Sequence, residues 1–276
     1  MSHNNQKKIA VINDFSGFGR CSITVSLPII SAMGIQCCAV PTAIFSNHTG
    51  YNEFFFDDYT DKMEDYFSMW KKLDLKFEGI ITGFLGSKNQ IKKVEKFISE
   101  FTSKRTVVIV DPVMGDNGRL YSTYTAEMCA ELKKLIPMAD IITPNLTEAC
   151  ILTDTPYNAD IMPDLDVLLK TARRLCSGRT EKVVITGIPD GKMLNNLVYE
   201  ANGKYSLIST VKIGEDRAGT GDVFSSIIAA DAVNGVDFTE SVRKAGQFIT
   251  KAVKRSIELK LPTQDGICFE EFLKEL

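Results

Sequence analysis

"EDRAGTGDVF", residues 215–224, leads directly into the apolar run FSSIIAADAV, which is long enough to form a helix. Gly219, Thr220, Gly221 and the carboxylate of Asp222 would then stand at the start of that helix. A helix start leaves several backbone N–H groups unpaired and carries partial positive charge. Glycines let such a backbone approach an anion closely. The segment therefore predicts a cradle for a transferring phosphate.

Asp222 itself has two explanations. A carboxylate is out of place beside a bound anion, but it suits a general base that takes a proton from an attacking hydroxyl group. It equally suits an ordinary helix start, where an acidic side chain interacts favourably with the helix dipole. The stretch alone leaves both explanations open, so other segments have to decide between them.

Short apolar runs alternate with helix-like patterns upstream of this stretch. The runs are nearly continuous, as in a parallel sheet buried on both faces, and they span residues 8–12, 34–45, 79–84, 106–111, 140–144 and 182–187. Helices are predicted near residues 20–33, 59–73, 88–102, 122–136, 145–153, 163–177, 220–234, 238–258 and 268–275. Asn202-Gly203 predicts a hairpin between two further strands, 193–200 and 204–210.

This alternation predicts an α/β fold, with a doubly wound, mostly parallel central sheet and helices on both faces. No linker rich in Pro, Gly or Ser divides the chain, so we expect residues 1–276 to form a single domain, with residues 1–7 disordered. Any lid would come from residues 44–57 and would be small or absent.

Polar and glycine residues gather where the predicted strands end, which is where ligands bind in sheets of this kind. In chain order they are Asn13 and Asp14, the segment SNHTGY (46–51), Gly83 and Phe84, Asp111, Asn145, Glu148, Thr186 and Gly187. We therefore expect a binding crevice along this edge of the sheet.

Two of these segments carry carboxylates. DPVMGDNGRLY (111–121) places Asp111 and Asp116 in a loop, where carboxylates either orient Mg²⁺ or form a solvated turn. TPNLTE (143–148) places Asn145 at a helix N-cap and Glu148 in the first turn, which is the pattern of a capping box and also suits a magnesium site. Three acidic positions beside one anion cradle favour metal-assisted phosphoryl transfer.

Composition and missing motifs narrow the function classes. The formal net charge of −3 argues against nucleic acid and anionic membranes as partners. Seven cysteines without a CxxC pattern, and no apolar run of ~18 residues, favour a cytoplasmic protein with free thiols. The two histidines are too few for most histidine-based catalytic or metal sites. A P-loop, a complete GxGxxG fingerprint and the protein-kinase motifs are all lacking.

Four motifs carry a resemblance to a known family. RAGTGDVF (217–224) resembles the signature of the ribokinase-like superfamily, and SNHTGY, DPVMGDNG (111–118) and DIITPNLTEA (140–149) resemble its pyridoxal kinase branch. The resemblance runs in order from about residue 8 to residue 258. It implies ATP and Mg²⁺, transfer of the γ-phosphate to a primary hydroxyl group on a pyridine, and a homodimer. It leaves open whether a monovalent cation is also needed.

The resemblance also implies roles for individual residues. Asp222 would deprotonate the 5′-hydroxymethyl group of pyridoxal, pyridoxine or pyridoxamine, and the backbone of Gly219, Thr220 and Gly221 would form the anion hole. The vitamer site would comprise Asn13, Asp14, His48, Thr49, Gly50, Tyr51 and Phe84. The ATP site would comprise Asp111, Thr143, Asn145, Glu148, Thr186, Gly187, Gly219 and Gly221, with Asp111 and Glu148 as the metal ligands.

Some features leave the substrate open. Asp14 stands where many pyridoxal kinases have a serine, and its carboxylate could pair with a ring nitrogen or an amine, or accept sugar hydroxyls. Phe84 stands where a tyrosine often packs on the ring. Hydroxymethylpyrimidine kinases, small-sugar kinases and a non-catalytic vitamer or nucleotide sensor are alternatives with the same fold. Asp222 argues against the pyrimidine kinases, which often carry a cysteine there, and the intact acidic and glycine positions argue against a sensor.

Overall fold

The central feature of the fold is a single mixed sheet. The structure is a computed structural model that describes residues 2–157 and 164–276. Within these residues nine strands form one sheet in the order β11-β10-β9-β8-β5-β4-β1-β2-β3. The strands are β1 (Lys8–Phe18), β2 (Gln36–Asn47), β3 (Phe56–Asp58), β4 (Gly79–Thr82), β5 (Val107–Val110), β8 (Ile141–Ile142), β9 (Lys182–Asp190), β10 (Met193–Glu200) and β11 (Tyr205–Val211). Along the sheet, every pair of neighbours from β2 through β1, β4, β5 and β8 to β9 is parallel. Strand β3 pairs antiparallel with β2, and β10 pairs antiparallel with both β9 and β11.

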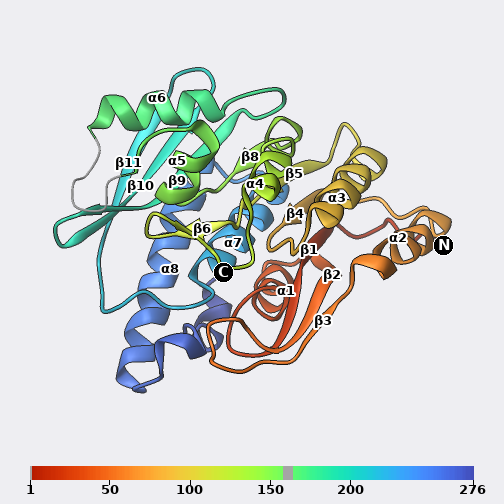
Figure 1. The fold of residues 1–276 in the computed structure, drawn as a ribbon, viewed down its shortest axis with the longest axis horizontal. Helices are drawn as coiled ribbons and strands as arrows, with labels where there is room; N and C mark the ends of the chain where they lie inside the picture. The colour runs from red at the N-terminus through yellow and green to blue at the C-terminus, as the bar shows by residue number, and fades with distance from the viewer. Residues whose placement is uncertain (1, 158–163) are drawn as a thin grey trace.

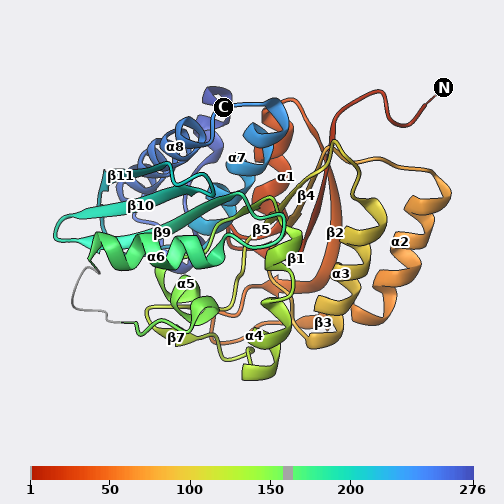
Figure 2. The same cartoon turned by 90° about the horizontal axis from the view of Figure 1, so that it is seen from above.

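Helices cover both faces of this sheet (Figure 1). Figure 2 shows one layer made by α1 (Ile23–Ala32), α7 (Thr220–Asn234) and α8 (Phe238–Glu258). The opposite layer contains α2 (Met63–Lys72), α3 (Lys88–Phe101), α4 (Ala126–Leu132), α5 (Leu146–Thr153) and α6 (Leu165–Leu175). Alternate residues of β1 serve the two cores: Ile9 and Val11 pack with α1, α7 and α8, and Ala10 and Ile12 pack with the other layer. The predicted doubly wound α/β fold is confirmed.

Strand β1 is longer than predicted, and the extension shapes the binding crevice. The apolar run predicted a strand over 8–12, but β1 continues to Phe18 beside β2, with an irregularity in the pairing between Asn13 and Phe15. Such a bulge re-aims side chains locally. Asn13 and Asp14 are both buried at this point, so the bulge brings two polar side chains to the end of the sheet's parallel part.

Short pairings account for most of what the sequence did not predict. Strand β3 adds three residues to the edge of the sheet beside β2, at the end of the segment 44–57 from which we expected any lid. A separate hairpin, β6 (Gly115–Asp116) with β7 (Arg119–Leu120), forms inside the predicted acidic loop. The predicted hairpin at Asn202-Gly203 is confirmed, because β10 and β11 pair antiparallel across it and Gly203 has a φ of 92°.

The helices follow the predictions with local corrections. Helix α1 starts at Ile23 rather than near residue 20, because Ser22 has a φ of 57° and cannot continue a helix. The predicted helix over 268–275 is a 3₁₀ helix, η4 (Glu270–Glu275). Helix α6 matches the prediction for 163–177, although residue 163 lies outside the described residues. No helix in the described part of the chain is long and apolar enough to cross a membrane.

Residues 2–7, which we expected to be disordered, make contacts that disorder would not allow. The Asn4 side-chain amide donates to the Asp74 carbonyl oxygen at 2.9 Å, and its oxygen accepts from the Lys76 amide at 2.9 Å. Lys7 Nζ donates to the Val233 carbonyl oxygen at 3.1 Å. These contacts fix the segment against the start of the sheet. Residue 1 lies outside the described residues.

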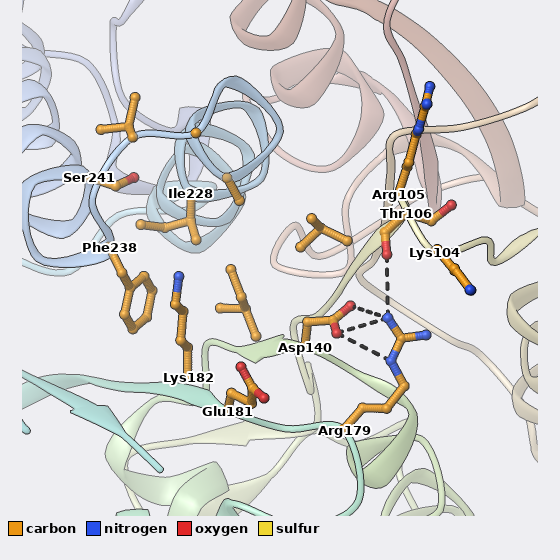
Figure 3. Close-up of a pocket in the computed structure, with 15 residues that line it drawn as sticks. Lys104, Arg105, Thr106, Asp140, Arg179, Glu181, Lys182, Ile228, Phe238 and Ser241 are labelled. Carbon is orange, nitrogen blue, oxygen red and sulfur yellow. Dashed lines mark hydrogen bonds and ion pairs between the residues drawn. The ribbon is translucent and has the colours of Figure 1, made fainter. Parts of the chain in front are cut away.

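A small cavity of about 340 Å³ opens at the amino ends of β5, β8 and β9, beside the last turns of α7. Figure 3 shows Arg179 directed at Asp140, and the two side chains form an ion pair at 2.8 Å. Arg179 also donates to the Thr106 carbonyl oxygen at 3.3 Å. Lys182 lies over the ring of Phe238 in the same view. These contacts link residues at the amino ends of neighbouring strands, which is the end of the sheet opposite the predicted crevice.

Candidate active site

A cavity of about 940 Å³ occupies the predicted crevice at the carboxyl ends of the strands. With one exception, it gathers the residues that the resemblance assigned to the vitamer, ATP and catalytic sites, and they come from seven separate segments of the chain. Those in its lining are Asn13, Asp14, His48, Thr49, Gly50, Phe84, Asp111, Thr143, Asn145, Glu148, Thr186, Gly187, Gly219, Thr220, Gly221 and Asp222. Tyr51 is the exception, and it is not part of the lining.

The glycine-rich helix start forms part of the cavity wall. Gly219 is the N-cap of α7 and has a φ of 74°, a conformation that favours glycine. A Cβ atom at Gly219 would overlap the Arg20 carbonyl oxygen, whereas a Cβ at Gly221 would meet nothing within 4 Å. The first glycine is therefore required by a close backbone contact. The second keeps the wall open, so a ligand can approach the first-turn amides, which have no partners within the helix.

Asp222 is partly buried and lies in the first turn of α7. Its Oδ1 accepts a hydrogen bond from the Asn13 side-chain amide at 3.0 Å. Burial raises the pKa of Asp222 to about 6, and the nearby charge of Asp14 adds to the shift. A carboxylate with this pKa is ionised at neutral pH and is still basic enough to accept a proton from a reacting hydroxyl group.

Asn13 lines the cavity, but its side-chain nitrogen and oxygen already form hydrogen bonds within the protein. Besides donating to Asp222, its side-chain oxygen accepts from the backbone amides of Asp14 at 2.9 Å and Phe84 at 2.8 Å. A Cβ at Gly83 would overlap the Asn13 side chain, so that glycine is needed for the close approach. We expected Asn13 to bind the vitamer. In the structure it positions Asp222 and the backbone that carries Phe84.

Asp14 is similarly engaged. One carboxylate oxygen accepts from the Ser22 hydroxyl at 2.5 Å and the other accepts from the Ser16 hydroxyl at 2.9 Å. Burial raises the pKa of Asp14, and the two serine hydrogen bonds oppose that shift. Asp14 lines the cavity together with Asn13 and His48, so its charge acts in that part of the site. Each oxygen keeps further lone pairs with which it can accept from a ligand.

His48 has a fixed tautomer. Its Nε2 lies 2.7 Å from the Gln264 carbonyl oxygen, which only accepts, so Nε2 carries the hydrogen. Its Nδ1 in turn accepts from the Gly50 amide at 3.1 Å. Both ring nitrogens therefore have protein partners. His48 lines the cavity, and it is left with ring carbon atoms, rather than a polar group, for contact with a substrate.

Tyr51 supports His48 from behind. The two rings are 4.8 Å apart at their centroids, and the Tyr51 hydroxyl donates to the Asp265 carboxylate at 2.7 Å. Tyr51 thus supports the loop 46–51 from behind and is not part of the cavity surface. On the other side of the cavity, Phe84 meets Phe45 edge to face at 6.2 Å. An aromatic wall of this kind suits the flat ring of a substrate.

Two carboxylates mark the other end of the cavity. Glu148 and Asn145 form the predicted capping box: the Asn145 side chain accepts from the Glu148 amide at 2.9 Å, and Glu148 accepts from the Asn145 amide at 2.8 Å. Burial raises the pKa of Glu148 well above its usual range, with a further contribution from Asp111. Burial and the charge of Asp222 likewise raise the pKa of Asp111.

This carboxylate set fits a divalent cation. Asp14, Asp111 and Glu148 are buried, Asp222 is partly buried, and all four line one cavity. None of them forms an ion pair within the described residues. The described part of the chain contains no group of three or more His, Cys, Asp or Glu side chains that could hold a metal ion. Mg²⁺ is commonly held by one or two carboxylates together with substrate phosphates and water, so Asp111 and Glu148 suffice as its protein ligands.

The other residues expected to bind ATP line the cavity and make few side-chain hydrogen bonds with the rest of the protein. The buried hydroxyl of Thr143 has no hydrogen-bond partner within the described residues, which leaves it available to a phosphate or to metal-bound water. Thr186 forms an isolated parallel bridge with Asn145. Gly187 has a φ of 68°, and a Cβ there would meet nothing within 4 Å, so this part of the wall has room for a ligand.

Sequence reasoning missed several lining residues. Arg217 stands in the quoted RAGTGD stretch, and its Nε is buried without a partner in the described structure. Ser22 carried no distinguishing signal, and Cys21, whose place in the sequence suggested the substrate side of the fold, was expected to be structural; both line the cavity. Burial raises the pKa of the Cys21 thiol to about 12, so it remains protonated. Further lining residues, Asn196, Thr210, Ile249 and Val253, come from β10, β11 and α8 and had no distinguishing pattern.

Comparisons with known proteins agree with this site. Residues 23–265 match the family model described as phosphomethylpyrimidine kinase. A solved protein from Bacteroides thetaiotaomicron, provisionally named a phosphomethylpyrimidine kinase, is 39% identical, with a TM-score of 0.96 over 100% of this chain and 95% of that chain. A second crystal form, solved with pyridoxal, is 38% identical, with a TM-score of 0.94 over 98% of this chain and 96% of that chain.

A curated relative points the same way. The pyridoxine/pyridoxal/pyridoxamine kinase of Bordetella avium is 25% identical over 270 residues, which cover 90% of this chain and 86% of that protein. The family match spans most of the chain, including Glu148 and Asp222, and begins after Asp14. The chain therefore belongs to the phosphomethylpyrimidine kinase family, in the pyridoxal kinase branch of the ribokinase-like superfamily.

Proposed function

We propose that the chain is a vitamin B6 kinase, which transfers the γ-phosphate of ATP to the 5′-hydroxymethyl group of pyridoxal, pyridoxine or pyridoxamine. The observation that carries this proposal is the position of Asp222. It contacts Asn13 at the vitamer end of the cavity, and its charge reaches Asp111 at the carboxylate end. Likeness to the Bacteroides protein solved with pyridoxal supports the substrate class.

The residues of this chain supply a base and an anion hole. Asp222 takes the proton of the substrate hydroxyl group as that oxygen forms a bond to the γ-phosphorus. The bond from the γ-phosphorus to the β,γ-bridging oxygen breaks in the same transfer, and ADP leaves. The first-turn amides of α7, at Gly219, Thr220 and Gly221, stabilise the charge on the transferring group. Phosphoryl transfer needs positioning and charge stabilisation more than covalent help from the protein, so this set is sufficient.

Asp111 and Glu148 would hold Mg²⁺ together with the phosphates of the nucleotide. The bound ion supplies charge neutralisation to the triphosphate. The carboxylates need such a cation, because burial and mutual repulsion disfavour their ionised forms. A requirement for a monovalent cation stays a prediction, which is checked by comparing turnover in potassium chloride and in tetramethylammonium chloride.

The experiment incubates the protein with Mg·ATP and each of the three vitamers in turn, and mass spectrometry then measures the phosphorylated product. We expect at least one vitamer to be phosphorylated at its 5′ position. Folded protein that phosphorylates none of them would refute the proposal. Folded protein that binds a vitamer without consuming ATP would instead favour a sensor.

Hydroxymethylpyrimidine is a second candidate acceptor, because the matched family model carries the phosphomethylpyrimidine kinase description. Both acceptors are flat heteroaromatic rings with a primary hydroxyl group, and Phe84 can pack on either. The same assay therefore includes hydroxymethylpyrimidine. We expect its kcat/KM to be lower than that of the preferred vitamer, and the reverse order would make the chain a pyrimidine kinase.

We also infer a homodimer, a single domain and a reducing compartment. Exposed apolar side chains cluster at the β1–β3 edge; they are Phe15, Phe18, Ile44, Phe54, Phe55 and Phe56. A cluster of this kind suits burial against a second copy of the chain, and light scattering would detect such a dimer.

One continuous sheet supports the single domain. Free thiols at all seven cysteines suit the cytoplasm.

A further inference from the structure

The segment LPTQDG (261–266), which follows α8, lies behind the active site and is not part of the cavity lining. It contains the 3₁₀ turn η3 (Thr263–Asp265). We call this segment the latch, because it forms hydrogen bonds with three separate segments that do line the cavity. No motif in the sequence indicated a role for this segment, and two of the segments that it holds lie more than 200 residues away along the chain.

The first segment is the vitamer loop, residues 46–51. The Gln264 carbonyl oxygen accepts from His48 Nε2 at 2.7 Å, and the Asp265 carboxylate accepts from the Tyr51 hydroxyl at 2.7 Å. These two contacts orient the neighbouring rings of His48 and Tyr51, which are tilted at 56° to each other. The latch therefore fixes which face of the loop is turned to the cavity.

The second segment is the anion cradle. The Ala218 amide donates to the Thr263 carbonyl oxygen at 3.2 Å. Arg217 Nη1 donates to the carbonyl oxygens of Leu261 at 3.0 Å and Pro262 at 3.1 Å. The chain directly before Gly219 is thus held by the same segment that holds the vitamer loop.

The third segment is the turn between β1 and α1. The Arg20 amide and its Nη1 both donate to the Asp265 carbonyl oxygen, at 3.2 Å and 3.3 Å. The Arg20 backbone is also packed closely against two glycines. A Cβ at Gly266 would come within 2.8 Å of the Arg20 carbonyl oxygen, and a Cβ at Gly219 would overlap the same atom. The three segments therefore meet at Arg20 and the latch.

We propose that the latch is a positioning element for the kinase reaction, and that Asp265 is the residue through which it sets affinity for the vitamer. This inference rests on the proposed function for its substrate. The Asp265 carboxylate contacts Tyr51 and does not line the cavity, so it acts on the vitamer only through the loop. It makes no contact with the nucleotide-side residues in the described structure.

The test compares Asp265→Ala, Asp265→Asn and Tyr51→Phe with the wild type. Removing the carboxylate frees the Tyr51 ring, so Asp265→Ala should raise the KM for pyridoxal about fivefold or more, while the KM for Mg·ATP changes less than about twofold. Asparagine can still accept from the Tyr51 hydroxyl, so Asp265→Asn should restore most of the affinity. Tyr51→Phe should reproduce the Asp265→Ala effect.

A double-mutant cycle isolates the contact. If Tyr51 and Asp265 act through one hydrogen bond, the double variant Tyr51→Phe/Asp265→Ala should be no worse than either single variant. Additive losses would overturn the proposal, as would an equal rise in the two KM values of Asp265→Ala. Glu271→Gln is the matched control: it removes an exposed carboxylate nearby, which pairs with Arg255, and it should leave both KM values within about twofold.

Hydrogen exchange provides a readout that does not depend on turnover. The amides of Gly50 and Tyr51 are bonded within the loop, to His48 Nδ1 and to the His48 carbonyl oxygen. Asp265→Ala should speed exchange in the peptide covering residues 46–51, and Glu271→Gln should not. Unchanged exchange in Asp265→Ala would overturn the latch. Absence of vitamer phosphorylation by the wild type would refute the proposed function instead, so the two failures are distinguishable.

Discussion

The properties of Asp222 come from its surroundings. Burial raises its pKa from 3.8 to about 6, so the folded chain holds this proton more tightly than the unfolded chain does. The contribution of Asp222 to stability therefore declines as the pH rises from about 4 to about 6 and stays low above that range. The protein retains a base near neutrality at a cost in folding free energy.

The first prediction concerns that cost. Asp222→Asn removes the buried charge and keeps the approximate shape, so the variant should be more stable than the wild type at pH 8, by on the order of 2 kcal/mol. The lost interaction with the helix dipole reduces this gain. The difference should vanish near pH 4. Urea unfolding at both pH values measures it, and a variant less stable than the wild type at pH 8 would contradict the origin given for the pKa.

The second prediction concerns Asp14, whose carboxylate is held by Ser16 and Ser22 at the vitamer end of the cavity. Asp14→Ser removes a negative charge there, so substrates that differ in charge should respond differently. We expect kcat/KM for pyridoxamine to change relative to pyridoxine by about fivefold or more, with catalysis retained. The three kcat/KM values measure this. A uniform change across the vitamers would remove Asp14 from the choice of substrate.

At the scale of the element, α5 combines a structural and a chemical role. Its capping box closes the helix start with Asn145 and Glu148, and the same Glu148 faces Asp111 in the cavity. Either role alone would explain the residue. The two are separable, because a capping box accepts glutamine in place of glutamate, whereas a metal site depends on the charge.

The third prediction uses that difference. Glu148→Gln removes the charge and can keep the cap, but its amide group would face one of the two backbone N–H groups, of Asn145 and Met114, from which Glu148 accepts. Loss of that hydrogen bond and relief of the buried charge act on stability in opposite directions. The discriminating result is therefore the Mg²⁺ concentration for half-maximal activity, which should rise about tenfold. Ser87→Ala is the matched control: Ser87 caps α3 by accepting from the Gln90 amide at 3.2 Å, and its loss costs about 1 kcal/mol of stability without altering the Mg²⁺ dependence. Unchanged Mg²⁺ dependence in Glu148→Gln would reduce Glu148 to a capping residue.

At the scale of the whole molecule, most of the fold was predictable, because strands buried on both faces read as continuous apolar runs. The run around Ile80 and Ile81 is an example, since both of its faces are covered by helices. Strand β3 was not predictable, because its residues FDD are exposed and only three long. Its pairing depends on β2 and not on a pattern of its own.

The site was predictable to the extent that its residues follow strand ends. The direction of each side chain was not. Tyr51 stands in the same short motif as His48, and nothing in that motif shows that Tyr51 turns away toward Asp265. Its direction depends on a contact between residues far apart in the chain. The engagement of Asn13 with Asp222 depends on a similar long-range contact.

The most direct test of the account is the turnover number of Asp222→Asn beside that of the wild type, with the preferred vitamer and saturating Mg·ATP. Asparagine fills the same space but cannot accept the proton, and loss of a general base commonly costs about 10²–10⁴ in rate. We predict that kcat falls by this factor while the Kd for Mg·ATP stays within about twofold. A variant that turns over within about threefold of the wild type would contradict Asp222 as the base.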